Sequence, residues 1–159
     1  MKEMEVEKTL ARLVATYGPG TSDGLYPTAA QWRSLLERPY DGVLCTAQFA
    51  KFHPEFLTKQ EIVEANEAYG AVTEKLRPKL GFDILYEGVF GGVLFGEAEK
   101  VPWDFIGMLK FPSLEAFLGL WLDPDYVKVA HIQKPLALER YKLIVTYPPF
   151  TYPAPWVDG

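Results

Sequence analysis

The stretch that decides the fold spans residues 111–144 and reads FPSLEAFLGLWLDPDYVKVAHIQKPLALERYKLI. Pro-Ser at 112–113 opens a helix, and Asp123 with Pro124 restarts it, because Asp is a good N-cap and Pro suits the first helical position. The predicted buried face of the helical region carries Leu114, Phe117, Leu118, Trp121, Tyr126, Val127 and Ala130, with His131 on or near it. Pro135 is expected to break the helical ladder. A strand, YKLIVTY, then follows at 141–147.

Three strands and one long helix are predicted upstream of this stretch. The strands are GVLCTAQFAKF (42–52), FDILYEGVF (82–90) and FIGMLKF (105–111). Both faces of the first are largely apolar, so both are expected to be covered. Thr58 and Glu61 have capping-box spacing and predict a helix that runs to about Lys79. The piece VLFG, at 93–96, is expected to continue the second strand as a bent or paired extension.

The resulting order is β-α-β-β-α-β, which predicts an α+β, ferredoxin-like fold with a four-stranded antiparallel sheet and helices on one face. The other sheet face still carries apolar side chains, so a homodimer built sheet on sheet is expected. The predicted domain covers residues 41–148. Residues 1–40 form an N-terminal helical arm that is expected to wrap the partner or cap a pocket mouth. Residues 149–159 form a Pro-rich, aromatic tail that is expected to be extended.

The composition narrows the class of function. Of 159 residues, 48% are hydrophobic and 14% aromatic, and that aromatic excess needs a core, an interface or an apolar pocket. The net charge is −5 without a basic run, so nucleic acid and anionic membranes are not expected as partners. No apolar run is long enough to span a membrane or to act as a signal peptide, so a cytoplasmic protein is expected. Cys45 is the single cysteine, and it is expected to be a buried, inert thiol.

The quoted stretch resembles the C-terminal half of dimeric α/β-barrel proteins. The shared pattern is a strand that ends in F-P-S, a helix with D-P-D-Y and A-H, and a last strand of the R-L-I type. The similarity extends back through Trp103-Asp104 and Tyr69-Gly70 to the first strand, where Gln48 stands at a position that relatives often fill with Asn. It implies the fold, a dimer and a pocket for a small apolar ligand. More distant members include EthD-like proteins and aromatic polyketide cyclases, and the superfamily hosts many reactions.

Three residues are candidates for catalysis. His131 is a candidate general base because imidazole is the side chain that most often moves protons near neutral pH, although a histidine that packs the helix and bonds a nearby carbonyl is the alternative. Gln48 is a buried amide that needs partners, either a ligand carbonyl or tyrosine and backbone groups across the dimer. Tyr69 is expected to donate to a ligand oxygen or to belong to the core. His53, which precedes a proline, is interpreted as a turn residue.

Further residues are candidates for substrate binding because they are aromatic or polar along the predicted strands and helix. They are Thr46, Tyr86, Trp103, Phe105 and Trp121. No spacing of His and carboxylate residues typical of a metal site occurs, so neither a metal nor a cofactor is expected, although haem bound through His131 alone stays open.

Two hypotheses follow. The first is an enzyme without a metal that acts on an apolar, aromatic or polyketide-like substrate by proton transfer, as a cyclase, isomerase or lyase, or as a cofactor-free monooxygenase. The second is a non-catalytic ligand-binding or accessory dimer.

Overall fold

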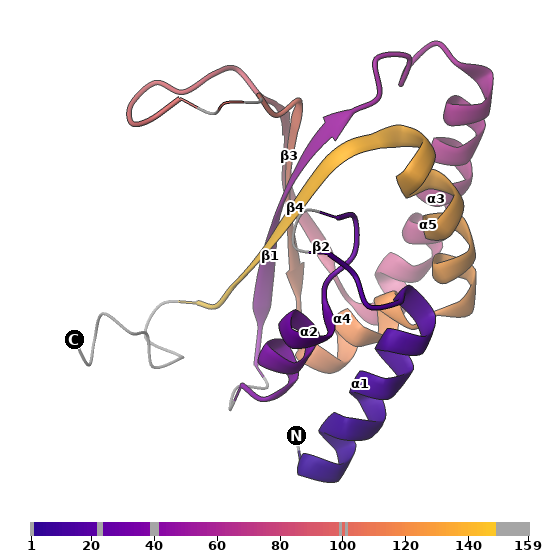
Figure 1. Cartoon of the computed structure of the whole chain (residues 1–159), viewed down its shortest axis with the longest axis vertical. Helices are drawn as coiled ribbons and strands as arrows, with labels where there is room; N and C mark the ends of the chain where they lie inside the picture. The colour runs from indigo at the N-terminus through magenta and orange to yellow at the C-terminus, as the bar shows by residue number, and fades with distance from the viewer. Residues whose placement is uncertain (1, 22–23, 39–41, 99, 101, 149–159) are drawn as a thin grey trace.

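The computed structural model describes residues 2–21, 24–38, 42–98, 100 and 102–148. Two helices come first, and a βαββααβ sequence of elements follows (Figure 1). The elements are α1 (Glu3–Tyr17), α2 (Ala29–Leu36), β1 (Leu44–Phe52), α3 (Gln60–Leu80), β2 (Asp83–Val89), β3 (Phe105–Phe111), α4 (Leu114–Trp121), α5 (Pro124–Ala137) and β4 (Leu138–Thr146). The predicted α+β, ferredoxin-like class and its N-terminal helix are confirmed. Predictions about Pro39 and the tail at 149–159 lie outside the described residues.

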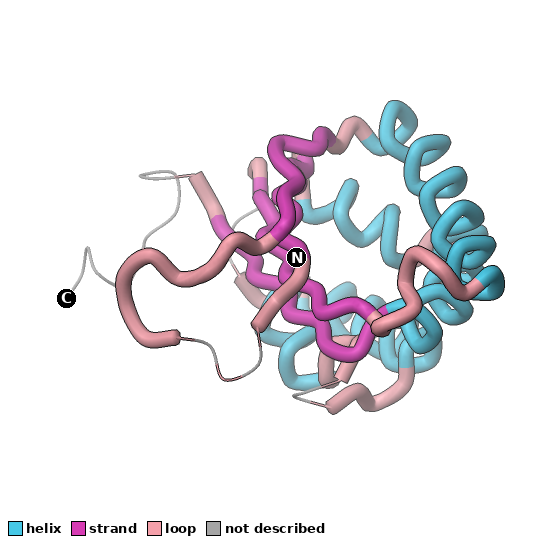
Figure 2. The backbone as a smooth tube through the Cα atoms, turned by 90° about the horizontal axis from the view of Figure 1, so that it is seen from above, coloured by secondary structure: helices cyan, strands magenta, loops and turns pink. Residues whose placement is uncertain are grey.

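The four strands form one antiparallel sheet in the order β2-β3-β1-β4. Helices α3, α4 and α5 lie on one side of this sheet, and the other side carries no helix among the described residues (Figures 1 and 2). β1 is therefore a central strand, and β4 is an edge strand beside it. Gln48 of β1 faces Gly107 on one side and Leu143 on the other, which places its side chain on the helix-covered face with Thr46 and Leu44.

Side-chain caps begin α2 and α5, and the cap at Asp123 confirms the sequence prediction. The Thr28 side chain accepts a hydrogen bond from the backbone N–H of Gln31, and the Gln31 side chain accepts one in return, so α2 begins with a capping box. Asp123 caps α5 by accepting from the N–H groups of Asp125 and Tyr126.

Three predicted local features are wrong. No Thr58–Glu61 capping box forms, because the N–H of Thr58 donates to the carbonyl of Glu55 in a preceding turn and the N-cap of α3 is Lys59. The VLFG piece is a loop with Leu94 and Phe95 fully exposed, since Gly91 and Gly92 lead the chain away from the sheet. Pro135 does not break α5, because a proline so close to the C-terminus deprives the helix of only one backbone hydrogen bond.

The N-terminal arm packs on its own chain. Apolar residues of α1 and α2 share one core with α4, and they include Leu13, Tyr17, Trp32 and Leu36. The Tyr17 hydroxyl donates to the backbone carbonyl of Trp121, and the two rings meet edge to face. This contact fixes the arm beside the C-terminal end of α4, where it forms one wall of the site described below.

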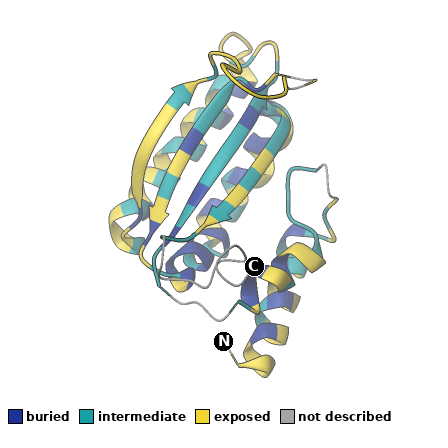
Figure 3. Cartoon of the chain, turned by 90° about the vertical axis from the view of Figure 1, so that its left-hand side faces the viewer, coloured by how far each residue is buried: buried dark blue, intermediate teal, exposed yellow. Residues whose placement is uncertain are grey.

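The open face of the sheet is apolar and only partly covered (Figure 3). Met108 of β3 pairs with Ala47 of β1, and Ala47 pairs with Ile144 of β4, so the three side chains share this face. Cys45 lies on the same face and is half-buried, not fully buried as the sequence predicts.

In the described part of the chain, the helices are too short or too polar to cross a membrane.

Candidate functional site

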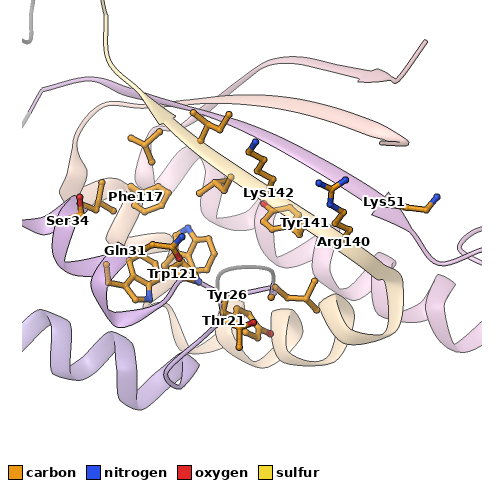
Figure 4. A pocket seen from close by; sticks show the side chains of 18 of the residues that line it. Thr21, Tyr26, Gln31, Ser34, Lys51, Phe117, Trp121, Arg140, Tyr141 and Lys142 are labelled. Atoms are coloured by element: carbon orange, nitrogen blue, oxygen red, sulfur yellow. The ribbon is translucent and has the colours of Figure 1, made fainter. Parts of the chain in front are cut away.

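A cleft of about 1000 Å³ lies between the N-terminal arm, the edge strand β4 and helix α4 (Figure 4). Its lining mixes polar, aliphatic and aromatic side chains, and the aromatic ones are Tyr26, Trp32, Trp103, Phe117, Trp121 and Tyr141. The arm supplies the first two of these residues. Alternation along β4 directs Tyr141 towards the helices, so it forms the floor with Trp121 of α4. A cleft of this volume is large enough for a drug-sized organic molecule.

Gln48 reaches this cleft through Tyr141. The Tyr141 hydroxyl donates to Oε1 of Gln48 over 2.6 Å, from the neighbouring strand and on the same face of the sheet. Burial raises the pKa of Tyr141 well above its ordinary value, so the phenol stays neutral. The amide thus holds the ring that forms the cleft floor, and its partner is a tyrosine of the same chain, whereas the sequence alternative placed the tyrosine across the dimer.

His131 reaches the cleft through Tyr26. Its Nε2 lies 3.0 Å from the carbonyl oxygen of Thr16, which only accepts, so Nε2 carries a proton. Its Nδ1 lies 3.1 Å from the Tyr26 hydroxyl, and Tyr26 lines the cleft. The ring is exposed and faces the arm, not the apolar side of α5 as the sequence predicts, because Thr16 and Tyr17 at the end of α1 and Tyr26 contact it there.

Tyr69 lies elsewhere in the interior. Its hydroxyl is 3.3 Å from that of Tyr126, which joins α3 to α5, and neither residue lines the cleft. The three predicted catalytic residues therefore bond to three different tyrosines and do not converge on one point. His53 accepts a hydrogen bond from the N–H of Glu55, as expected of a turn residue.

The predicted substrate-binding residues divide in the same way. Trp121 and Trp103 line the cleft. Tyr86 lies on β2, at the opposite edge of the sheet from β4, and is 59% exposed. Phe105 packs against Phe52 and does not line the cleft. Thr46 is 1% exposed, and its hydroxyl has no hydrogen-bond partner in the described structure.

Lys134, like Tyr26 and Tyr141, is a residue of the site that sequence reasoning missed. It is 2% exposed, and its Nζ lies 4.3 Å from the ring centre of Tyr141 and 5.2 Å from that of Trp121. Burial lowers the pKa of this amine from 10.5 to about 8. The sequence does contain a signal that Lys134 is buried. Lys134 stands four residues after Ala130 and eight after Tyr126, so it continues the buried stripe of α5.

Positive charge collects around the cleft, although the whole chain is acidic. Four basic side chains belong to the lining of the cleft, and they are Arg38, Lys51, Arg140 and Lys142. The acidic side chain of the lining is Glu139. The Arg140 guanidinium stacks 4.0 Å from the ring centre of Trp103, and Lys51 lies 4.0 Å from Asp104.

Among the described residues, no three His, Cys, Asp or Glu side chains gather in a way that could hold a metal ion.

A ferredoxin-like α+β chain with an aromatic cleft at one edge of its sheet is the class of protein that these observations define. Neither a family model nor a curated protein matches the chain. The RPA0582 protein of Rhodopseudomonas palustris, described as of unknown function, has a similar structure. Its TM-score is 0.67 and its sequence identity 22%, over 80% of this chain and 98% of that one.

Two further structures are less similar. Hydroxynitrile lyase from Passiflora edulis has a TM-score of 0.48 and 18% identity, over 70% of this chain and 98% of its own. A dabb family protein with a ferredoxin-like fold from Mesorhizobium loti has a TM-score of 0.46 and 14% identity, over 67% and 97%. At these identities the likeness concerns the fold alone.

Proposed function

We propose that the protein is a metal-independent enzyme that binds a small aromatic or polyketide-like compound in the cleft and transfers a proton on it. The observation that carries this proposal is the Tyr26–His131 pair. Tyr26 lines the cleft, and its hydroxyl lies 3.1 Å from an imidazole nitrogen whose ring is held by the Thr16 carbonyl. A histidine oriented by a second group is the usual arrangement of a general base.

The Tyr26–His131 pair can exist with the imidazole of His131 neutral or protonated. With neutral His131, the Tyr26 hydroxyl donates to Nδ1, and the tyrosine oxygen is left to accept a proton from a bound compound. With cationic His131, Nδ1–H donates to the Tyr26 oxygen, and the hydroxyl proton turns to the Ala130 carbonyl, 3.3 Å away. Burial raises the pKa of Tyr26 to about 12, so the phenol relays a proton without becoming a free phenolate.

Gln48 and Tyr141 have a positioning role in this proposal. Their mutual bond fixes the Tyr141 ring as a flat surface against which an aromatic ring can stack. The reaction class is a cyclisation, an isomerisation or a lyase step that begins with loss of a proton from an activated carbon. Tyr69 is a residue of the packed interior in this scheme.

Deuterium exchange tests the proposal without knowledge of the natural substrate. The protein is incubated in D₂O with a panel of aryl 1,3-diketones and arylacetaldehydes, and loss of the α-proton signal is followed by NMR. The expected result is exchange faster than in buffer that Tyr26→Phe and His131→Ala each slow by about 10²-fold or more. Exchange that both variants leave unchanged would overturn the assigned roles.

A non-catalytic ligand-binding protein is the second candidate, and the separation of the three residue pairs favours it. Absence of exchange with every compound that binds the cleft would support this alternative. In either case, the apolar open face of the sheet supports a homodimer built sheet on sheet, because a monomer would leave Met108 and Ile144 in water.

A further inference from the structure

Lys134 is a buried lysine whose charge has no role in the proposed proton relay. A lysine that is 2% exposed has lost its hydration, and such a residue normally pairs with a carboxylate. Among the described residues, no carboxylate forms an ion pair with it. Its only close electrostatic contacts there are the faces of the Trp121 and Tyr141 rings. The ring faces return only part of the lost hydration energy.

The position of this unpaired charge points to the cleft. Trp121 and Tyr141, the two rings that contact Nζ, also form the cleft floor. The basic side chains Arg38 and Lys142 at the rim add positive charge from the arm and from β4. Another donor without a partner in the described structure is the indole N–H of Trp32, a lining residue that is 2% exposed. The indole N–H of Trp32 can only donate, and Lys134 does not itself line the cleft but places its charge against the two floor rings, so both groups favour a ligand that brings an anionic acceptor.

We propose that the cleft binds an aromatic compound that carries an ionised acidic group, a carboxylate or a phenolate, and that Lys134 supplies the charge that neutralises it. The aromatic part stacks on the floor, and the anion lies towards Lys134. Lys134 is buried, so its charge is screened less by water than a surface charge and attracts a nearby anion more strongly. This inference uses the cleft of the proposed function, but it does not depend on proton transfer.

The test compares two matched probes, naphthalene-2-carboxylate and naphthalene-2-carboxamide, which differ in charge and hardly in shape. Binding to the full-length protein at pH 7 is followed by quenching of tryptophan fluorescence and by calorimetry. We expect the acid to bind about tenfold tighter than the amide or better. Lys134→Met should reduce this preference to less than about threefold, whereas Lys128→Met, on the exposed side of α5, should preserve it.

The amide also reports whether Lys134→Met still folds around the cleft, because its affinity should not change. Equal binding of acid and amide to the unaltered protein would overturn the inference, as would an acid preference that survives in Lys134→Met or failure of both probes to bind. A preference for the acid in a protein without deuterium exchange would support the anion site and remove the proton relay, so the two proposals can fail separately.

Discussion

Replacing Lys134 by Met should make the protein more stable at neutral pH. The ordinary pKa of a lysine is 10.5, and burial lowers that of Lys134 to about 8. At about 1.4 kcal/mol for each pH unit, keeping the folded protein protonated at this site costs about 3 kcal/mol. The contacts with Trp121 and Tyr141 offset part of that cost, by roughly 0.5–2 kcal/mol each. Methionine fills similar space without a charge, so a gain of up to about 2 kcal/mol is expected.

The pH dependence of this gain follows from proton binding. Between pH 8 and 10.5 the unfolded chain holds a proton on Lys134 that the folded protein has lost, so the stability of the unaltered protein rises with pH in this window. The advantage of Lys134→Met is therefore complete below about pH 8 and disappears towards pH 10.5. The titratable groups nearby are Tyr69, Tyr126 and Tyr141, whose pKa values burial raises, so they stay neutral in most of the window.

Urea denaturation of both proteins at several pH values between 7 and 10.5 measures the difference. In a thermal unfolding experiment at pH 7, the melting temperature of Lys134→Met should lie roughly 2–10 °C above that of the unaltered protein. Lys128→Met is the control, because Lys128 is exposed on the same helix and its replacement should change stability by less than about 0.5 kcal/mol at every pH. A Lys134→Met protein that is less stable at pH 7, or a difference in stability that is constant with pH, would show that the buried ammonium group does not lower the free energy of unfolding.

Three other changes test the packing around the site. Tyr17→Phe leaves the Trp121 carbonyl without its donor and should lower the free energy of unfolding by about 1–3 kcal/mol in urea; an unchanged midpoint would mean that the arm is not held there. Asp123→Ala removes the N-cap of α5 and should cost about 1 kcal/mol by the same assay, and no loss would contradict the capping role. Met108→Asp places a charge on the open sheet face and should convert a dimer to monomers in light scattering, whereas Leu57→Asp, at an exposed turn, should not.

The sequence by itself determined the order and type of the elements, because these depend on local periodicity and local capping. β3 was predicted with its exact bounds, 105–111, and the cap of α5 at Asp123 was correct. Errors arose where distant or neighbouring backbone competed with a local signal. Thr58 lost its capping role to a turn, and the glycines after β2 ended the pairing of that strand.

Only the tertiary structure decided which side chains meet. His131 stands 105 residues after Tyr26, and Gln48 stands 93 residues before Tyr141, so no local pattern could predict either pair. The end of α1 and Tyr26 meet His131 on the exposed side of α5, and the register of β4 on β1 brought Tyr141 to Gln48. Lys134 is an intermediate case. Its place on the buried stripe of α5 could be read from the sequence, but the two rings and the cleft beside it exist only after β4 and α4 have packed together.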